Sequence, residues 1–425
     1  MTATAVQPKR ILIATIGSLG DLHPCLALAL ELQRRGHHVT LASTPFYRPK
    51  VEALGLAFHG IRPAWDPSDA DLVSLCEELK RGPEILFRKI VLPHLRETYD
   101  DLLSAATQAD FMLAGEIIFP APLIAEKLWL PWASVILSPA SFLSSDDPPI
   151  LVNAPWLFHV RRAGAPVHRA LLNLGRIGTS HWWNPVRDLR REIGLRPHCD
   201  PVFRDKFSPS LVLALFSRVL AKIQPDWPPQ TTQPGFVFFD RSKPDPENEA
   251  KLASFLAAGA PPIVFTLGST AVANPGNFFH ASTQAAALLD RRAILIGAHD
   301  HNSSETILSL PYAPYSKVFP HAAAIVHQGG SGTTAQALRA GRPMLIVPYG
   351  WDQPDNGARV RRLGAGLTLA RANYSAASAA AAIRRLLTTS SFLRSAEAAA
   401  AQIAAENALA RACDAIESAL QHAYR

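Results

Sequence analysis

Glycines, hydroxyl side chains and a carboxylate–amide pair lie close together in residues 326–356, between and after two short apolar runs. Residues 322–327 have the composition of a buried parallel strand, which ends abruptly in glycines as a strand does before a tight turn. From Ser331 the pattern predicts a helix that ends at Gly341. A helix that opens on Ser-Gly-Thr-Thr presents free backbone N–H groups and the positive end of its dipole. These features predict an anion site, above all for a diphosphate.

The loop differs from two common phosphate-binding motifs. It lacks the G-x-x-x-x-G-K-[ST] of a P-loop and the G-x-G-x-x-G of a dinucleotide fingerprint. His327, at the end of the strand, can donate to a phosphate oxygen. Tight-turn sterics alone would explain an isolated glycine cluster. However, Asp352 and Gln353 follow the next apolar run at the same edge of the expected sheet, and their side chains suit sugar hydroxyls.

This segment resembles the donor-binding signature of the inverting family 1 glycosyltransferases of GT-B fold. Residues 312–319, YAPYSKVF, resemble the opening W-A-P-Q-x-x-I-L of that signature, with Tyr312 in the base-stacking position and Tyr315 replacing the glutamine. The resemblance covers nearly the whole chain and is greatest to bacterial rhamnosyltransferases, sterol glucosyltransferases and glycopeptide glycosyltransferases. It implies these donor-binding residues: Gly20, Ser269, Tyr312, Ala313, Tyr315, His327, Gly329, Gly330, Ser331, Gly332, Thr333, Trp351, Asp352 and Gln353.

A carboxylate follows the first predicted strand, in the turn Gly17-Ser18-Leu19-Gly20-Asp21. This edge of the sheet would face the donor loop across a cleft, so Asp21 is the candidate general base for an acceptor hydroxyl. The turn resembles the G-x-x-G-D turn whose aspartate is the proposed base in glycopeptide glycosyltransferases. Asp21 can also cap a helix that we expect to open near Pro24, and the two roles are compatible.

Many other members of the family use a histidine base paired with an aspartate. This chain has Leu19 and Gly115 at about those positions, so both are missing. His23 is therefore the alternative base, and Glu116 is a candidate orienting partner.

The elements that position these residues form two similar halves. Residues 10–43 have the pattern of a βαβ unit, and residues 263–297 repeat it. A chain of 425 residues is too long for one ordinary core. We expect an α/β fold with two doubly wound Rossmann-like domains facing each other across a cleft, which is the GT-B architecture. The predicted divisions are an acceptor-binding domain 1–239, a linker 240–261, a nucleotide-sugar-binding domain 262–405 and a C-terminal helix 406–425 that returns to the first domain.

An apolar acceptor pocket is expected around the proline-rich residues 138–155. Leu19, Phe142, Trp156 and Trp182 are the candidate acceptor-binding residues, although for any one of the aromatic side chains ordinary packing is the better explanation.

Composition and charge exclude several classes of protein. The net charge of +7 is spread over the chain without a nucleic-acid-binding motif, so no nucleic-acid partner is expected. Residues 80–96 mix basic and apolar side chains, which allows a weak peripheral membrane contact or, alternatively, a helix with a solvated basic face. No unbroken apolar run approaches eighteen residues, which predicts no transmembrane segment. Four scattered cysteines indicate reduced thiols and a cytoplasmic protein.

Metal chemistry has weak support in the sequence. Asp69-Ala70-Asp71 has the D-x-D form, and His299-Asp300-His301 could supply ligands, but both lie in polar, surface-like segments. A helix dipole with Ser269 and His327 can neutralise a departing diphosphate, so we expect no metal and no cofactor beyond a nucleotide-diphosphate sugar.

The resulting functional prediction is base-assisted inverting transfer of glucose or a deoxysugar such as rhamnose. The donor would be UDP- or dTDP-linked and the acceptor a phenolic, sterol or hydroxy-fatty-acid compound. The ribose-binding glutamate of the family aligns with Ala335, which leaves the nucleotide open. A nucleotide-sugar epimerase and a non-catalytic nucleotide-sugar-binding protein are the alternatives. The sequence does not choose the acceptor, an O- or C-glycosidic product, or the oligomeric state.

Overall fold

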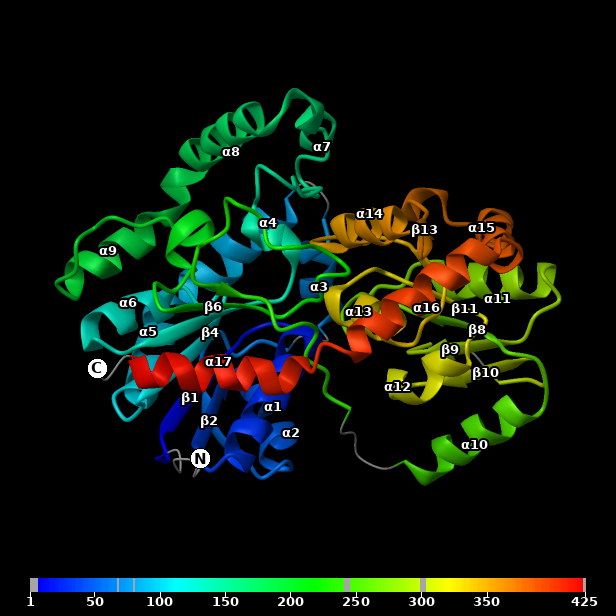
Figure 1. The fold of residues 1–425 in the computed structure, drawn as a ribbon, viewed down its shortest axis with the longest axis horizontal. Coiled ribbons are helices and arrows are strands. Elements are labelled where there is room, and N and C mark those ends of the chain that lie inside the picture. The colour runs from blue at the N-terminus through cyan, green and yellow to red at the C-terminus, as the bar shows by residue number, and fades with distance from the viewer. Residues whose placement is uncertain (1–6, 67–68, 79–80, 241–244, 299–302, 423–425) are drawn as a thin grey trace.

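The computed structural model describes residues 7–66, 69–78, 81–240, 245–298 and 303–422. They form two α/β domains, each with a parallel sheet between helices, arranged next to one another (Figure 1). This is the two-domain α/β fold that the repeated βαβ pattern predicts.

The sheet of the first domain has seven described strands in the order β3-β2-β1-β4-β5-β6-β7, all parallel. Its strands are β1 (Arg10–Ala14), β2 (His38–Ser43), β3 (Ala57–Gly60), β4 (Phe111–Gly115), β5 (Trp132–Ile136), β6 (Leu211–Ala214) and β7 (Thr231–Thr232). Its helices are α1 (Leu19–Arg34), α2 (Arg48–Glu52), α3 (Ala70–Cys76), α4 (Gly82–Ile85), α5 (Leu95–Ala106), α6 (Pro120–Leu128), α7 (Leu157–Val160), α8 (Ala165–Thr179) and α9 (Asn184–Glu192).

The second sheet has six strands within the described ranges, in the order β10-β9-β8-β11-β12-β13, again all parallel. The strands are β8 (Ile263–Thr266), β9 (Ala293–Ile296), β10 (Ile307–Leu310), β11 (Ala324–His327), β12 (Met344–Ile346) and β13 (Gly366–Thr368). The helices are α10 (Pro246–Ala257), α11 (Phe278–Leu288), α12 (Tyr315–Val318), α13 (Ser331–Arg339), α14 (Gln353–Leu363), α15 (Ala376–Thr388), α16 (Ser390–Ala404) and α17 (Ala408–His422).

Each sheet reverses its strand order once, between β1 and β4 in the first and between β8 and β11 in the second. Ligands of open parallel sheets bind beyond the carboxyl ends of the strands at such a reversal. The two loops that the sequence singles out, after β1 and after β11, both lie at these points.

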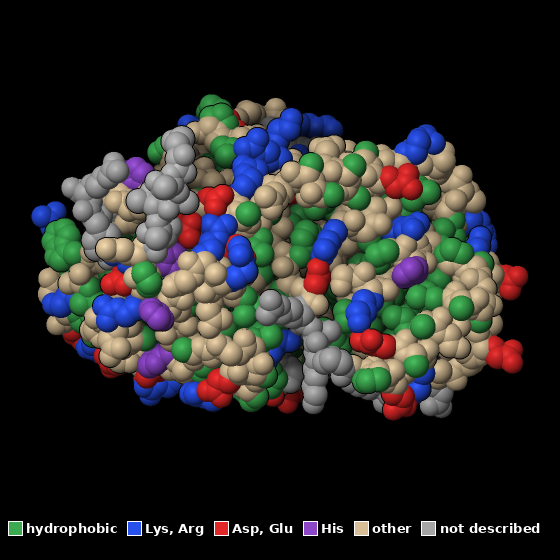
Figure 2. Space-filling model, turned by 60° about the horizontal axis from the view of Figure 1, so that its bottom comes forward, with side chains coloured by type: hydrophobic (Ala, Val, Ile, Leu, Met, Phe, Trp, Pro, Cys, Tyr) green, Lys and Arg blue, Asp and Glu red, His purple; other side chains and the backbone are tan. Residues whose placement is uncertain are grey.

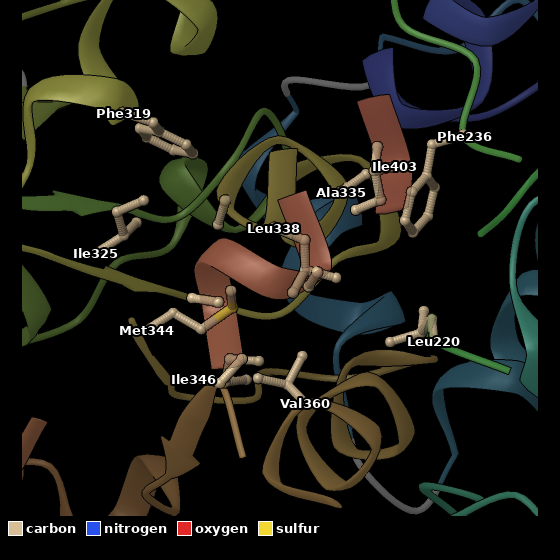
Figure 3. Packing of buried hydrophobic residues seen from close by; sticks show 14 of the residues in the cluster. Leu220, Phe236, Phe319, Ile325, Ala335, Leu338, Met344, Ile346, Val360 and Ile403 are labelled. Carbon is tan, nitrogen blue, oxygen red and sulfur yellow. The ribbon is translucent and has the colours of Figure 1, made fainter. Parts of the chain in front are cut away.

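Apolar side chains from sheet and helices fill the core of the second domain (Figure 3). Leu338 of α13 lies among Met344, Ile346 and Val360, and all four are fully buried. This packing fixes α13 over the sheet, so that the start of the helix has a defined position relative to the strand ends.

Helix α17 packs on the first domain rather than on the second. Its buried side chains Ala412, Cys413 and Ile416 join the cluster that contains the apolar face of α1. Arg35, just after α1, forms ion pairs with Asp414 at 2.6 Å and Glu417 at 2.8 Å. In Figure 1 this helix, drawn in red, crosses in front of the first domain, beside α1.

Two expectations about elements are wrong. Helix α1 begins at Leu19, five residues before Pro24, because Ser18 caps it. The stretch expected as a linker contains α10, whose Leu252 packs into a core cluster with the second domain.

The helix expected over residues 80–96 is present but irregular. It changes from α (Gly82–Ile85) to π (Leu86–Val91) to 3-10 (Leu92–His94), and Lys80 lies outside the described residues.

The apolar side chains of that last stretch face inward. Ile85, Leu86, Val91 and Leu92 are all buried, so they are not available for the lipid contact that the sequence allowed. Within the described residues, no helix is both long and apolar enough to cross a membrane.

Candidate active site

A cavity of about 760 Å³ lies between the domains. Its wall contains the loop after β1, the first turn of α13 and the residues from Trp351 to Gln353. The helices α1 and α13 begin close together, because a Cβ added to Gly332 would lie 3.8 Å from Cα of Gly20. The amino-terminal ends of two helices, one from each domain, thus meet at the cavity.

The loop before α13 is shaped for close backbone approach. Gly329 has φ +96°, and a Cβ there would lie 2.6 Å from Cγ2 of Ile346, so a side chain would not fit. Gly330 occupies the N-cap position, and no side chain caps α13. The wall is formed by Gly330, Ser331, Gly332 and Thr333. Uncapped N–H groups and the helix dipole make this turn suited to a diphosphate.

His327 does not take the role expected from the sequence. Its side chain is fully buried and lies outside the cavity wall, with Nδ1 accepting the N–H of Gly329 at 3.0 Å and Nε2 3.4 Å from Sδ of Met344. Burial lowers its pKa to about 3, so the ring is neutral. The expected bond to a phosphate oxygen is wrong for this geometry, since His327 instead holds the turn. Gly329 likewise shapes the loop without lining the cavity.

Asp352 joins the sugar-facing turn to the phosphate loop. Its Oδ2 accepts from the hydroxyl of Ser331 at 2.6 Å and from Nδ2 of Asn356 at 2.9 Å. Asn356 also donates to the backbone oxygen of Gly329 at 2.9 Å. Burial raises the pKa of Asp352. No sequence pattern indicated Asn356, because its role depends on the packing of α14 against the loop.

Gln353 lines the cavity but has a structural bond as well. Its Oε1 accepts the N–H groups of Tyr349 at 2.6 Å and Gly350 at 3.0 Å. Two N–H donors require the oxygen, so the amide NH₂ group is the part left for a ligand. Trp351, with φ +56°, lines the cavity and packs against the core of the first domain.

The nucleotide side of the cavity has two tyrosines. Tyr312 is half exposed on the cavity wall, beside Ala313. The ring of Tyr315 stacks on Phe319 with 4.4 Å between centroids, and its hydroxyl is 3.0 Å from Oγ1 of Thr266. Ser269 also lines this side.

Asp21 belongs to a capping box at the start of α1 and also lines the cavity. Its Oδ2 accepts from the N–H of Ser18 at 2.8 Å and from the Ser18 hydroxyl at 3.1 Å. Ser18, not Asp21, is therefore the N-cap residue. Burial raises the pKa of Asp21 to about 6, despite the hydrogen bonds from Ser18, and the charges of Glu116 and Asp352 raise it further.

His23 follows Asp21 by two residues on α1. Its ring packs on Phe239 with 5.1 Å between centroids, and its Nε2 has no hydrogen-bond partner within the described part of the chain. Burial lowers its pKa to about 4, which leaves it neutral near pH 7.

Glu116 was expected to orient the base, but it contacts other residues. It accepts from the hydroxyl of Ser141 at 2.8 Å and pairs with Nζ of Lys206 at 3.3 Å. All three residues line the cavity. Since its hydrogen bonds go to these residues, Glu116 acts on Asp21 through its charge rather than by orienting it. Nothing in the sequence indicated Lys206.

The aromatic acceptor residues are largely wrong. Phe142 is buried and stacks on Trp227 at 3.8 Å, Trp156 is exposed, and Trp182 lies outside the cavity beside Arg88. Leu19 does line the cavity. The apolar part of the wall is instead built from aliphatic residues together with other aromatic side chains, including Leu86, Phe87, Leu137, Ile150, Leu151, Val237, Phe238 and Phe239.

Charged side chains join the domains beside the site. Arg359 of α14, almost fully buried, pairs with Asp355 at 2.6 Å and with Asp147 of the first domain. Asp355 also accepts the N–H of Ile150 at 3.0 Å. We call Asp147, Arg359 and Asp355 the interdomain ion cluster. It holds the cavity-lining residues 150–153 against the helix that begins at Gln353.

Of the two candidate metal motifs, the structure describes only Asp69-Ala70-Asp71, and its side chains serve a helix cap. Asp69 accepts from the N–H groups of Asp71 and Leu72 as the N-cap of α3. His299, Asp300 and His301 lie outside the described residues. No group of three metal-ligating side chains occurs in the part of the chain that the structure describes.

Two doubly wound domains with a site at their facing sheet edges are the architecture of a GT-B protein. Residues 11–109 match the model of the glycosyltransferase family 28 N-terminal domain, and residues 296–418 match that of the erythromycin biosynthesis protein CIII-like C-terminal domain. The O-mycaminosyltylonolide 6-deoxyallosyltransferase of Streptomyces fradiae is 33% identical over 412 residues, covering 87% of this chain and 88% of that protein. The chain therefore belongs to the family 1 glycosyltransferases of GT-B fold.

Solved structures show the same fold. The kitacinnamycin glycosyltransferase has a TM-score of 0.70 at 21% identity, covering 97% of this chain and 99% of that one. The glycosyltransferase VinC in complex with DTDP has a TM-score of 0.68 at 20% identity, covering 97% of this chain and 100% of that one.

Proposed function

We propose that this glycosyltransferase moves a deoxysugar from a dTDP-linked donor to a hydroxyl of an apolar natural-product acceptor, with inversion at the anomeric carbon and Asp21 as the base. One observation carries the proposal. Asp21, partly buried and with its pKa raised to about 6, lines the same cavity as the uncapped first turn of α13.

Two features support a deoxysugar on dTDP. The 33% identical relative is named a deoxyallosyltransferase, and VinC was solved with DTDP. Ala335, at the position of the ribose-binding glutamate of the family, lines the cavity with a side chain that cannot hydrogen-bond. A deoxyribose lacks one of the hydroxyls that such a glutamate would hold, so its absence costs a dTDP donor less than a UDP donor.

The residues divide the reaction between the domains. The acceptor hydroxyl attacks the anomeric carbon and loses its proton to Asp21, while the bond from that carbon to the diphosphate oxygen breaks. The electron pair of this bond leaves with the diphosphate, whose charge the N–H groups at the start of α13 stabilise. Asp352 and the amide of Gln353 position the sugar. This scheme needs no metal ion.

The apolar part of the wall supports a hydrophobic acceptor. Leu86, Ile150 and Leu151 line the cavity on the first-domain side, whereas the polar groups belong mainly to the second domain and to the loop after β1. A volume of about 760 Å³ lies within the usual range for drug-sized ligands.

A donor and acceptor screen tests the proposal. Purified protein is incubated with dTDP-deoxysugars and UDP-glucose, each with macrolide, phenolic, sterol and hydroxy-fatty-acid acceptors, and products are identified by mass spectrometry. The anomeric configuration is then read by NMR. We expect transfer from dTDP donors with inversion. Transfer from UDP-glucose alone, or a product that retains the donor configuration, would contradict the corresponding part of the proposal.

A further inference from the structure

Helix α8 carries apolar side chains on the side that faces solvent. The exposed fractions of Val167, Leu174 and Ile177 are 43%, 63% and 69%, and Leu171 is partly exposed. At about 100° per residue, these four side chains fall within a sector of roughly 120°. His168, about 100° from Val167, is buried. The helix therefore packs on the protein through another side and leaves its apolar stripe uncovered by described residues, the reverse of a usual surface helix.

The chain around this stripe is basic. Residues 148–187 contain five arginines and neither an aspartate nor a glutamate. Arg162, three residues before the helix, is exposed, as are Arg169, about 80° around the helix from Ile177, and Trp156, whose exposed fraction is 56%. Aliphatic side chains with arginines and a tryptophan at their border are the composition of a helix that lies in the interface of an anionic membrane.

The position of the stripe supports this assignment. Helix α8 runs along the outer edge of the first domain, away from both sheets (Figure 1). The chain that leads to it passes through residues 150–153, which line the apolar part of the cavity. The helix is thus connected to the acceptor side of the site by a short stretch of chain.

We propose that α8 docks this enzyme on an anionic lipid surface, with Val167, Leu171, Leu174 and Ile177 in the acyl boundary and Arg162 and Arg169 among the headgroups. A second copy of the chain is a poor occupant, because it carries the same net charge of +7 and the same face without aspartate or glutamate. The choice of lipid over an acidic protein rests in part on the proposed function, since an apolar acceptor dissolves in the bilayer that the face would contact.

Vesicle sedimentation tests the docking. Full-length protein without any sugar donor is mixed with vesicles of phosphatidylcholine, or of phosphatidylcholine with one third phosphatidylglycerol. We expect binding to the anionic vesicles that decreases with added salt. Leu174→Ser combined with Ile177→Ser should lower the partition coefficient at least about tenfold, because two aliphatic side chains no longer enter the lipid. Arg162→Gln with Arg169→Gln should weaken binding to anionic vesicles only.

Leu288→Ser provides the matched control. Leu288 is 58% exposed on α11 of the second domain, so its loss removes a comparable side chain from another face and should leave vesicle binding unchanged. Equal sedimentation of the wild-type protein and the α8 double variant would overturn the proposal. It would also be overturned if the wild-type protein stayed in solution at low salt, or if it self-associated through this face and the double variant did not.

The test is independent of the transferase assignment. Binding to vesicles is measured without catalysis, and transfer to a water-soluble acceptor is measured without vesicles. We expect the double variant to keep its rate with the soluble acceptor. Loss of transfer in all proteins with vesicle binding intact would count against the proposed function and leave the docking surface standing.

Discussion

Asp21 has a structural role and a proposed chemical one, and its two oxygens can divide them. Both of its hydrogen bonds in the described chain are to Oδ2, from the backbone and hydroxyl of Ser18. Oδ1 therefore keeps its lone pairs for a proton from the acceptor. The capping box fixes the carboxylate, and burial brings its pKa close to the pH at which a general base works best.

The Asp21→Asn variant should lose turnover by at least about a hundredfold, since it keeps the shape and a capping oxygen but removes the base. In the wild-type protein, kcat/KM for an aliphatic alcohol should rise with pH through about 6, because the carboxylate must lose its own proton before it can accept another. Pre-steady-state and steady-state rates over a pH series measure both effects.

His23→Ala is the control for this assignment. If the Asp21 variant stays active and the His23 variant is dead, the base is His23 and the resemblance of the turn is misleading. Transfer to a phenolic acceptor should be less sensitive to loss of the base than transfer to an alcohol, since a phenol ionises more readily without the enzyme.

The Asp21→Asn substitution should lower turnover but raise the stability of the folded protein near neutral pH. The folded-state pKa of Asp21, about 6, is above the ordinary aspartate value of 3.8, so the folded state prefers the protonated form. Protonated Asp21 therefore stabilises the folded wild-type protein. This contribution is fully present below pH 3.8 and is lost as the pH rises through about 6. Asp21→Asn should therefore raise Tm at pH 7.5 relative to the wild-type protein, and the difference should shrink at pH 4. A lower Tm at both pH values would show that the cap prevails over burial.

Gln353→Glu separates the two roles of this side chain. The glutamate keeps an oxygen for the N–H groups of Tyr349 and Gly350 but lacks the NH₂ group left for the sugar. We expect reduced turnover of the dTDP-sugar with a smaller loss of affinity for free dTDP by calorimetry, and a lower Tm at neutral pH because the new carboxylate is buried next to Asp352 and Asp355. Gln353→Ala should also lower Tm, because two buried N–H groups lose their acceptor, at roughly 1–3 kcal/mol each. Equal loss of free dTDP affinity in the glutamate variant would place Gln353 on the diphosphate.

Residue types at strand ends located much of the site but not its details. Asp21, Ser331, Gly332 and Asp352 line the cavity because the carboxyl ends of parallel strands meet at one edge. Residue type does not, however, predict the direction in which a side chain points. His327 ends its strand pointing into the core, and Phe142 stacks within the core, which composition alone cannot distinguish from a place on the wall.

The first turn of α13 is proposed to bind the diphosphate through its backbone as a unit, rather than through single side chains. Gly332→Val places a branched side chain where the two helix starts approach, since even its Cβ would lie 3.8 Å from Gly20. We expect dTDP affinity to fall severely while the far-ultraviolet circular dichroism spectrum and Tm stay close to wild type. Gly175→Val is the control, because that helical glycine of α8 has no neighbouring atom within 4 Å of an added Cβ. Unchanged dTDP affinity in folded Gly332→Val would remove the phosphate site from this turn.

At the level of elements, apolar periodicity predicted the central strands well and their surroundings poorly. The runs before Gly17, Gly268 and Gly329 all form buried strands. Helix starts depended on side-chain caps, so the Ser18–Asp21 box set the start of α1 and Pro24 lies inside the helix. Helix α10 was missed because its exposed, charged sequence resembles a linker, and only its docking through residues such as Leu252 defines it.

The interdomain ion cluster links the two halves of the proposed reaction across the whole molecule. Figure 2 shows charges of both signs scattered over one face of both domains, where solvent weakens their pairing. Asp147 and Arg359, by contrast, are largely buried. Breaking a buried pair is costly because one charge remains without its partner.

Asp147→Asn should therefore raise KM for the acceptor several-fold and lower Tm, with little change in dTDP affinity. The physical reason is that residues 150–153 lose part of their attachment to α14. Glu52→Gln, which breaks the exposed pair of Glu52 with Arg48, should leave both quantities unchanged. Steady-state kinetics with each substrate varied in turn, together with thermal unfolding, measure the effect. An altered KM for the donor alone would contradict it.

Helix α17 makes the chain cross between the domains twice, once after Asp240 and again between α16 and α17. The second domain is therefore tethered to the first at both of its chain ends. The tether at its carboxyl end is held by the packing of α17 on the apolar face of α1 and by the ion pairs of Arg35 with Asp414 and Glu417. Helix α1 begins beside Gly332 at the cavity, so α17 anchors the second domain to the same helix whose first turn faces the phosphate loop. A chain lacking α17 would lose this tether, along with the cover over the apolar face of α1.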